Sequence, residues 1–271
     1  MRSWFWFSLT LTASFSVRAA DKVAVVDFGT PGFSQSEGKA LGDTYSLTHN
    51  GGRGIIAKLA KDGRGAMRTV YTVEGQVIMH LVLDDTYVYF LEVAPDLDNS
   101  AANVKRVAKD GSGSAELLAA VADSCGGLAV DALSVYWVQD GALFQAPKAQ
   151  SCPTCAGTRL TPLLSTSPSG YIIGPRLALD GDSVYWSSYD GVSATIHHTS
   201  KMGGADLWTL AAKGPSSLVV SNEKLYWLDV TQQSGPNTTG QAKIMSVGSD
   251  GRTPETLVEG EGLFAFSVDE N

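Results

Sequence analysis

The chain repeats the pattern of the stretch Leu177-Ala178-Leu179-Asp180-Gly181-Asp182-Ser183-Val184-Tyr185-Trp186, and this repetition indicates the fold. An apolar run, a polar turn and a run of β-branched and aromatic residues predict a β-hairpin. The same pattern occurs at residues 128–137 and 81–90, and a fourth copy at 218–227 has serine in place of the aspartate. A hairpin that recurs along a chain indicates a repeat architecture.

A complete repeat contains four predicted strands. After the hairpin, a third strand ends in a Lys-Asp-Gly turn at residues 61–63 and 109–111, and in altered form at 201–204 and 249–251. Glycine suits such turns because it accepts positive φ. A short fourth strand follows each repeat's third strand, at residues 67–71, 116–119, 161–164, 207–210 and 255–258. Repeats of about 40 to 50 residues with four strands predict an all-β propeller of antiparallel blades, with strands A to D running outward from the centre.

The repeats allow more than one number of blades. Five repeats are recognisable, the first of them degenerate, and a last copy at residues 266–269 stops after strand A. An isolated strand exposes unpaired edges. We expect it to complete a sixth, closing blade with residues 23–26, Val-Ala-Val-Val. A five-bladed ring and a truncated ring are the alternatives.

The first 19 residues predict a signal peptide. Arg2 supplies a positive start, and an apolar stretch with serine and threonine follows at residues 4–17. This stretch is too short and too hydroxylated for a membrane span, which needs about 20 apolar residues; a buried strand and an uncleaved anchor are the alternatives. Residues 20–40 then form a strand and a Gly/Ser/Pro-rich lead-in, and residues 41–271 form the propeller. We therefore expect an exported protein, whether periplasmic, at the cell surface or secreted, with no membrane span after signal removal.

Composition and charge narrow the classes of partner. Of the 271 residues, 44% are hydrophobic and 18% are charged, an ordinary balance for a folded domain. The formal net charge of −8 opposes binding to nucleic acid and to anionic lipid. We expect a monomer.

One repeat comes close to a known motif. Residues 226–229 read Tyr-Trp-Leu-Asp, residues 136–139 and 185–188 keep the aromatic half, and residues 89–90 read Tyr-Phe. Over residues 41–271 the repeat resembles the YWTD-type propeller repeats of the low-density lipoprotein receptor family and related exported bacterial propellers. The resemblance implies a six-bladed ring that binds proteins or small ligands, and it carries over no binding residue.

The repeated aromatic residues are predicted to fill the core between blades. Burying one ring removes about 150–250 Å² from water, worth roughly 4 to 6 kcal/mol. A residue that recurs in every blade is expected to stabilise the blade, so we favour core packing over an aromatic ligand cage. The residues are Tyr89, Phe90, Tyr136, Trp137, Tyr185, Trp186, Tyr226 and Trp227.

The aspartate that ends each A strand has a predicted structural role. Asp84, Asp131 and Asp180 sit where the chain turns, and an Asp side chain accepts backbone N–H bonds there. Ser221 can do the same more weakly. Because these turns are spread around the rim, we expect no metal site among them and no cofactor.

The three cysteines predict one local disulfide. Cys152 and Cys155 form a C-x-x-C spacing in a C–D loop, a position that suits neither thioredoxin-like chemistry nor, without a second pair, structural zinc. Cys125 is placed in a D–A connection at the opposite rim, a strand length away, beyond the reach of about 7 Å between disulfide Cα atoms. We predict a Cys152–Cys155 disulfide and a free Cys125.

Other chemistry has little local support. His197 and His198 point to opposite faces of one strand, so they cannot hold one ion together. No nucleophile elbow, phosphate-binding loop or dinucleotide motif occurs, so we assign no catalytic residue. Residues 96–99, Asp-Leu-Asp-Asn, lack the glycine and the distal glutamate of a calcium loop.

Function is predicted from the loops. The B–C loops vary most in length, and variable loops on a rigid ring usually carry binding. They contain Asp96, Asp98, Tyr189, Asp190 and Asp229, a set suited to a cation, a sugar or a basic protein. We therefore expect a non-catalytic scaffold that binds a protein or glycan through this rim. The alternatives are a hydrolase or lactonase-like enzyme with a central-channel site, which the aliphatic A strands disfavour, and a fragment without its own function.

Overall fold

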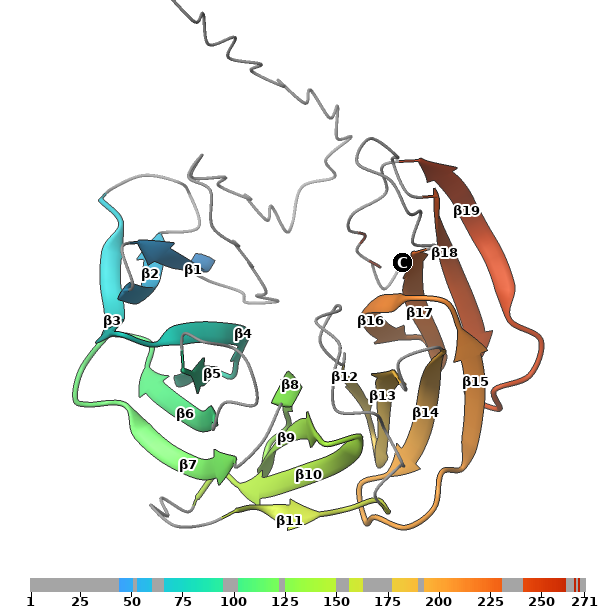
Figure 1. Ribbon diagram of the computed structural model, residues 1–271, viewed down its shortest axis with the longest axis horizontal. Helices are drawn as coiled ribbons and strands as arrows, with labels where there is room; N and C mark the ends of the chain where they lie inside the picture. The colour runs from blue at the N-terminus through green and yellow to red at the C-terminus, as the bar shows by residue number, and fades with distance from the viewer. Residues whose placement is uncertain are drawn as a thin grey trace, which may run out of the picture.

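The computed structural model places five antiparallel sheets around a common centre, one after another in chain order (Figure 1). It describes residues 44–50, 53–59, 66–94, 102–121, 125–149, 156–162, 177–189, 193–230 and 241–261, together with Phe266 and Val268. These residues form 19 strands and no helix. One sheet has three strands and four sheets have four, which confirms an all-β propeller of antiparallel blades.

Each blade consists of consecutive strands. Blade 1 comprises β1 (Thr44–Asn50), β2 (Arg53–Leu59) and β3 (Arg68–Glu74). Blade 2 comprises β4 (Val77–Leu83), β5 (Tyr87–Val93), β6 (Ala102–Ala108) and β7 (Glu116–Val121). Blade 3 comprises β8 (Cys125–Val130), β9 (Ser134–Gln139), β10 (Ala142–Pro147) and β11 (Thr158–Arg159). Blade 4 comprises β12 (Leu177–Asp180), β13 (Ser183–Tyr189), β14 (Ala194–Ser200) and β15 (Trp208–Ala212). Blade 5 comprises β16 (Pro215–Ser221), β17 (Lys224–Val230), β18 (Gln241–Gly248) and β19 (Glu255–Glu261).

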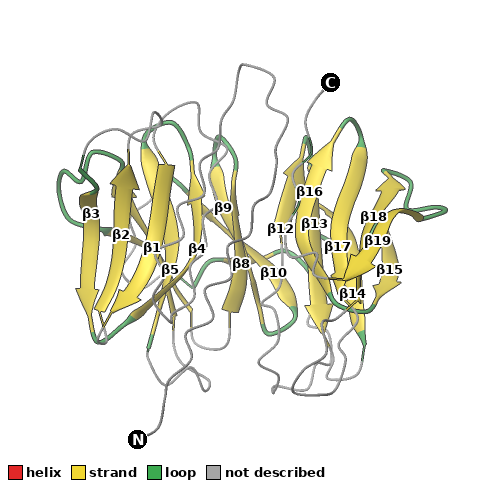
Figure 2. Cartoon of the chain, turned by 90° about the horizontal axis from the view of Figure 1, so that it is seen from above, coloured by secondary structure: helices red, strands yellow, loops and turns green. Residues whose placement is uncertain are grey.

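Strands within each four-stranded blade run outward in chain order, as predicted (Figures 1 and 2). The A–B and C–D connections therefore lie at one end of the blades, here called the A–B rim, and the B–C and D–A connections at the other, the B–C rim. Blade 3 departs from the expected pattern, because its outer strand is only the two-residue β11 rather than residues 161–164. There the Leu143 carbonyl still accepts the backbone N–H of Leu160 at 2.7 Å, but the Leu143 N–H donates to a side chain, Thr161 Oγ1, at 2.9 Å.

The blade count agrees with the number of recognisable repeats. Residues 23–26, the expected partner strand of a sixth blade, lie outside the described residues. Of the last repeat copy, only Phe266 and Val268 are described, and neither is in a strand. The sixth blade therefore stays a prediction, and so does the domain boundary at residue 41.

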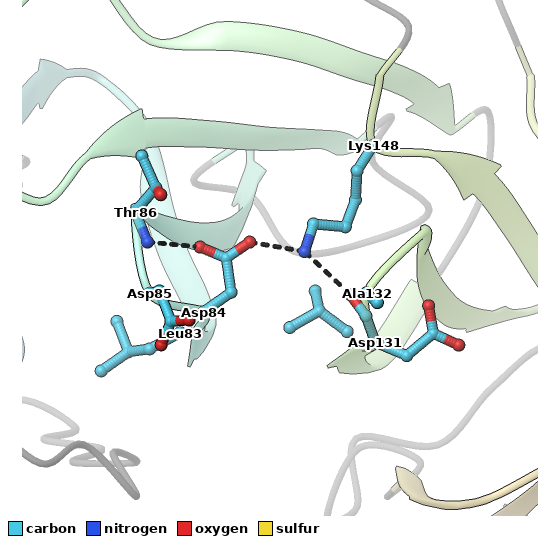
Figure 3. Close-up of a pocket in the computed structure, with 8 residues that line it drawn as sticks. Leu83, Asp84, Asp85, Thr86, Asp131, Ala132 and Lys148 are labelled. Carbon is cyan, nitrogen blue, oxygen red and sulfur yellow. Dashed lines mark hydrogen bonds and ion pairs between the residues drawn. The ribbon is translucent and has the colours of Figure 1, made fainter.

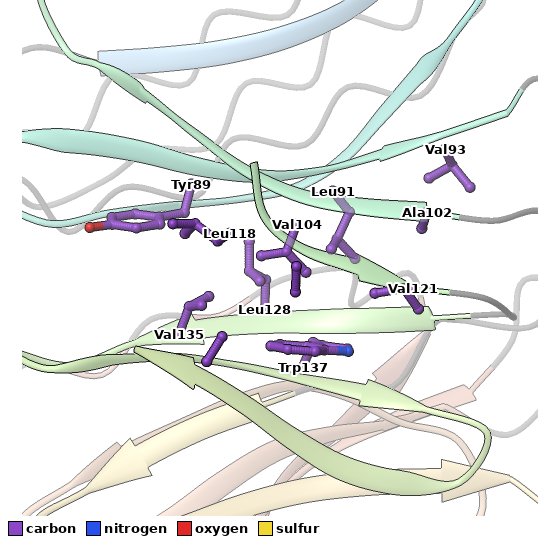
Figure 4. Close-up of a cluster of buried hydrophobic side chains, with 12 residues drawn as sticks. Tyr89, Leu91, Val93, Ala102, Val104, Leu118, Val121, Leu128, Val135 and Trp137 are labelled. Atoms are coloured by element: carbon purple, nitrogen blue, oxygen red, sulfur yellow. The ribbon is translucent and has the colours of Figure 1, made fainter. Parts of the chain in front are cut away.

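The repeated aromatic residues form the contacts between blades, as predicted. Trp137, Trp186 and Trp227 occupy equivalent places on β9, β13 and β17 and are at most 2% exposed. Figure 4 shows Tyr89 of blade 2 and Trp137 of blade 3 in one apolar cluster. Trp137, Trp186 and Trp227 each share an apolar cluster with the B-strand tyrosine of the preceding blade, which is Tyr89, Tyr136 and Tyr185 in turn. The remaining members of the repeated set are also buried, except Tyr226, which is half-buried.

A bulge in the inner strands escaped the sequence analysis. His80, Gly127 and Ser217 have positive φ of 49°, 61° and 52°, and the strand register shifts at each of them. The bulge interrupts the apolar alternation, so the inner strands begin several residues earlier than predicted. His80 lies inside β4 rather than before it. Cys125 is the first residue of β8, which corrects its assignment to a D–A connection.

Candidate functional site

The A–B turn of blade 2 is organised by Asp84. Its Oδ1 accepts the backbone N–H groups of Thr86 and Tyr87 at 2.8 and 2.7 Å. Its Oδ2 accepts the hydroxyl of Tyr89 at 2.7 Å. The carboxylate therefore closes the turn and anchors the buried tyrosine of its own blade, which confirms the structural role predicted for this aspartate.

Blade 3 repeats this arrangement around Asp131. Its Oδ1 accepts the N–H groups of Leu133 and Ser134 at 2.9 and 2.8 Å, and its Oδ2 accepts the hydroxyl of Tyr136 at 3.0 Å. The prediction for Ser221 is wrong, because its hydroxyl is buried without a hydrogen-bond partner. Strands β16 and β17 are joined by a two-residue turn with positive φ at both positions, and such a turn closes without a side-chain cap.

Lysines from the C–D turns connect neighbouring blades to these aspartates. Lys148 of blade 3 pairs with Asp84 Oδ2 at 2.5 Å and donates to the backbone oxygen of Asp131 at 2.8 Å (Figure 3). Lys201 of blade 4 pairs with Asp131 Oδ2 at 2.9 Å. Of these two lysines, only Lys201 belongs to a turn that recurs in the predicted pattern, and the tie of either lysine to the preceding blade was not predicted.

These contacts keep both carboxylates ionised. Burial alone would raise the pKa of Asp84, but the bonds from Lys148, Tyr89 and the turn backbone outweigh it and lower the pKa to about 2. For Asp131, bonds from Lys201, the backbone and Tyr136 likewise outweigh burial and lower the pKa to about 2. Burial, followed by the bond to Asp131, raises the pKa of Tyr136 to about 12.

An open pocket of about 350 Å³ lies between the A–B turns of blades 2 and 3 (Figure 3). This volume is at the lower end of small-molecule sites. Carboxylates and one ammonium group on its wall suit a small hydroxylated or cationic ligand. Two of these groups, Asp84 and Lys148, already bind each other. The lining residues are Leu83, Asp84, Asp85, Thr86, Val130, Asp131, Ala132 and Lys148.

Two of the predicted ligand-binding residues are in the described part of the chain. Tyr189 is half-buried at the end of β13. Asp229 is on β17, where its Oδ1 accepts the N–H groups of Lys213 and Gly214 at 2.9 and 2.8 Å. Asp229 thus also fixes the D–A connection of its blade. The other three predicted ligand-binding residues lie outside the described residues: Asp96, Asp98 and Asp190. The predicted disulfide partners Cys152 and Cys155 also lie outside them, and Cys125 is a free thiol.

Asp229 occupies a position that is polar in every four-stranded blade, two residues after the B-strand Trp or Phe. The equivalent residue of blade 2, Glu92, is buried and accepts the hydroxyl of Tyr71 in blade 1 at 2.6 Å. It also pairs with Lys105 of its own blade. In blades 3 and 4 this position holds Gln139 and Ser188.

Blade 4 contains the two histidines, on opposite faces of β14 as predicted. His197 stacks on Trp186 with ring centroids 4.0 Å apart, and His198 stacks on Tyr185 at 4.4 Å. His197 Nε2 is 2.8 Å from Ser188 Oγ, and its Nδ1 is 2.7 Å from Asp206 Oδ2. Ser188, His197 and Asp206 therefore form one continuous hydrogen-bonded chain.

This hydrogen-bonded chain was only partly predictable from the sequence. Strand pairing places His197 opposite Trp186 and Ser188 opposite Thr195, on one face of the blade. That part follows from the hairpin pattern. Asp206, however, comes from the C–D turn, whose path no strand periodicity predicts.

The described residues show neither a metal-binding cluster nor a membrane-spanning helix. Among them, no three His, Cys, Asp or Glu side chains are grouped so as to hold a metal ion. The same part of the chain contains no helix long and apolar enough to cross a membrane.

Solved structures share the fold. An oligogalacturonate lyase in complex with manganese superposes with a TM-score of 0.51 at 11% identity over 83% of this chain and 64% of the lyase. The β-propeller fold is therefore shared. A functionally unknown protein from Desulfotomaculum acetoxidans DSM 771 superposes with a TM-score of 0.52 at 12% identity, over 82% of this chain and 68% of that protein. At such identities the likeness concerns the fold alone. No protein-family profile and no curated protein sequence matches the chain.

Proposed function

We propose that this protein is an exported scaffold that binds a protein or glycan on its B–C rim. The observation that carries the proposal is the contrast between the two rims. On the A–B rim, the recurring aspartates and lysines hold blades 2, 3 and 4 together. On the B–C rim, the connections differ from blade to blade, and rigid blades with variable loops suit recognition.

The strand bounds show how unequal these connections are. In blade 3, Gln139 of β9 and Ala142 of β10 are joined by a two-residue turn. In blade 5, β17 ends at Val230 and β18 begins at Gln241. Asp96, Asp98 and Asp190 follow the B strands of blades 2 and 4 in the sequence, and Tyr189 is the last residue of β13, next to the blade 4 connection. The whole chain has a formal net charge of −8. These acidic residues therefore favour a neutral glycan or a basic protein surface over nucleic acid.

A YWTD-type repeat is part of the same proposal. Its support is the buried B-strand tyrosine and tryptophan pair, followed by a polar fourth residue at Glu92, Gln139, Ser188 and Asp229. The resemblance and the predicted signal peptide favour a monomer outside the cytoplasm.

A central-channel enzyme has less support. The described inner strands carry one histidine, His80, and its Nε2 accepts the N–H of Gly127 in the next blade at 3.3 Å. It therefore connects the bulges of two inner strands.

Binding to a glycan array and to a library of basic peptides tests the scaffold function. We expect the wild-type chain to bind members of one library, and Tyr189→Ala combined with Asp190→Asn to weaken that binding at least about tenfold. The control, Asp85→Asn, alters an exposed carboxylate of the A–B pocket and should leave binding unchanged. Binding lost in the control but kept in the loop variant would place the site in the A–B pocket instead.

A further inference from the structure

The hydrogen-bonded chain of blade 4 has the arrangement of an activated serine. We propose that Ser188 is the nucleophile of an ester-hydrolysing site, with His197 as general base and Asp206 as the residue that positions it. The Oγ–Nε2 and Nδ1–Oδ2 distances of 2.8 and 2.7 Å are within the range for such a relay. This activity goes beyond the scaffold function, and it lies between blades rather than in the central channel.

Charge assigns the role of each atom. Burial would raise the pKa of Asp206, but hydrogen bonds from His197 and Thr199 outweigh it and hold that pKa below its ordinary value. An ionised carboxylate only accepts, so His197 must donate from Nδ1. Its Nε2 is then left as an acceptor for the hydroxyl of Ser188, which is the tautomer that a general base requires.

Packing fixes the imidazole in this orientation. The His197 ring lies on Trp186 with an interplanar angle of 15° and is 3% exposed. Trp186 Nε1 donates to Thr199 Oγ1 at 3.0 Å, and Thr199 donates to Asp206 Oδ1 at 2.7 Å. The second carboxylate oxygen is therefore held as well, so Asp206 cannot turn away from His197. Ser188 is half-buried near the end of β13, closer to the B–C rim.

The same hairpin contains a natural control for this arrangement. Ser183 Oγ lies 2.8 Å from His198 Nε2, the same distance as in the first pair. However, His198 Nδ1 is buried without a hydrogen-bond partner, so no carboxylate fixes its tautomer. Burial lowers the pKa of His198. One serine–histidine pair thus has a positioning carboxylate and the other does not.

The proposed reaction balances with water as the second substrate. Ser188 Oγ attacks the ester carbonyl carbon, forming a C–O bond, while its proton moves to His197 Nε2. The bond to the leaving alcohol then breaks, and the alcohol takes that proton. Water attacks the acyl-serine, passes a proton to His197 and releases the carboxylic acid as Ser188 recovers its hydrogen. The acidic chain favours uncharged or cationic esters over anionic ones.

Covalent labelling of the full chain with a fluorophosphonate probe tests the proposal. The serine oxygen forms a bond to phosphorus, fluoride leaves and the proton passes to histidine. We expect peptide mapping of the wild-type protein to find the label on Ser188, and the Ser183→Ala variant to be labelled equally fast. Labelling on Ser183 at a similar rate, or on neither serine, would overturn the proposal, and this mapping needs no variant that might fail to fold.

Hydrolysis of p-nitrophenyl acetate tests the roles. We expect Ser188→Ala to lose the activity, and Asp206→Asn to lower kcat by about 10³- to 10⁴-fold through the wrong tautomer. Because Asp206 does not touch the ester, KM should stay within about threefold in Asp206→Asn. Asp206→Glu should recover part of kcat. Equal activity of wild type and Ser188→Ala, with both folded by circular dichroism, would show that the hydrogen-bonded chain only joins the strands.

Discussion

Replacing Asp131 by asparagine should reduce stability in a pH-dependent way. The substitution keeps an acceptor for the turn but removes the charge that binds Lys201 of the next blade. Lowering a carboxyl pKa from 3.8 to about 2 corresponds to about 2 kcal/mol of stability at neutral pH. Since the side chain is 24% exposed and partly screened by solvent, we expect about 1 kcal/mol.

The sign of the pH dependence follows from the lowered pKa. Asp131 contributes its stability above pH 3.8, and that contribution is lost as the pH falls through about 2. Urea unfolding should therefore show a difference of about 1 kcal/mol between wild type and Asp131→Asn at pH 7, and a smaller difference at pH 3.

Two controls make this prediction specific. Asp85→Asn removes an exposed carboxylate from the neighbouring blade's turn and should change stability by less than about 0.5 kcal/mol. In the background of Lys201→Met, Asp131→Asn should cost less than it does alone, because the two charges act together. The inter-blade ion pair would be refuted as the cause if Asp131→Asn lost the same stability at pH 7 and pH 3. It would also be refuted if Asp131→Asn lost as much stability in the Lys201→Met background as it does alone.

Three other predictions concern packing and the free thiol. Trp186→Ala, at a fully buried position, should cost about 3 to 5 kcal/mol in urea unfolding, whereas Met202→Ala, at a side chain that is 91% exposed, should change stability by less than about 0.5 kcal/mol. Gly157→Ala would place a Cβ 2.3 Å from the ring of Trp137 at a φ of +70°, so its melting temperature should fall by several degrees, about 2–4 °C per kcal/mol. Burial raises the pKa of Cys125 to about 12, so this thiol should react with Ellman's reagent much more slowly in the folded protein than in guanidinium.

The inter-blade ties explain why the turn residues recur. An aspartate at each of two A–B turns binds its own backbone, its own tyrosine and the lysine of the next blade. Removing one residue therefore disturbs a turn, a core side chain and a blade contact together. In blade 5 the Lys-turn has Ser249 instead of lysine, so this charge pair cannot form between blades 4 and 5.

The amino-acid pattern alone predicts the blade and most of its strands. Alternating apolar residues, tight turns and paired aromatics are local patterns. They predict strands, hairpins and buried positions respectively. They placed Trp137, Trp186 and Trp227 at equivalent buried positions and His197 and His198 on opposite faces. Local patterns were weaker where the alternation is interrupted, as at the bulge of His80 and at the short β11.

Which side chains of different blades and turns meet depends on the folded chain. Lys148 is paired with Asp84 because blades 2 and 3 lie side by side. The spacing of the two residues along the chain does not predict how the blades are placed relative to each other. Asp206 reaches His197 because the end of the C–D turn lies alongside β14, where the Leu207 N–H donates to the His198 backbone oxygen. Contacts of this kind depend on the direction of each side chain and on the packing of one sheet against another. They appear only when the ring is assembled, which is why the repeats predicted the architecture and the proposed chemistry of blade 4 had to be found in space.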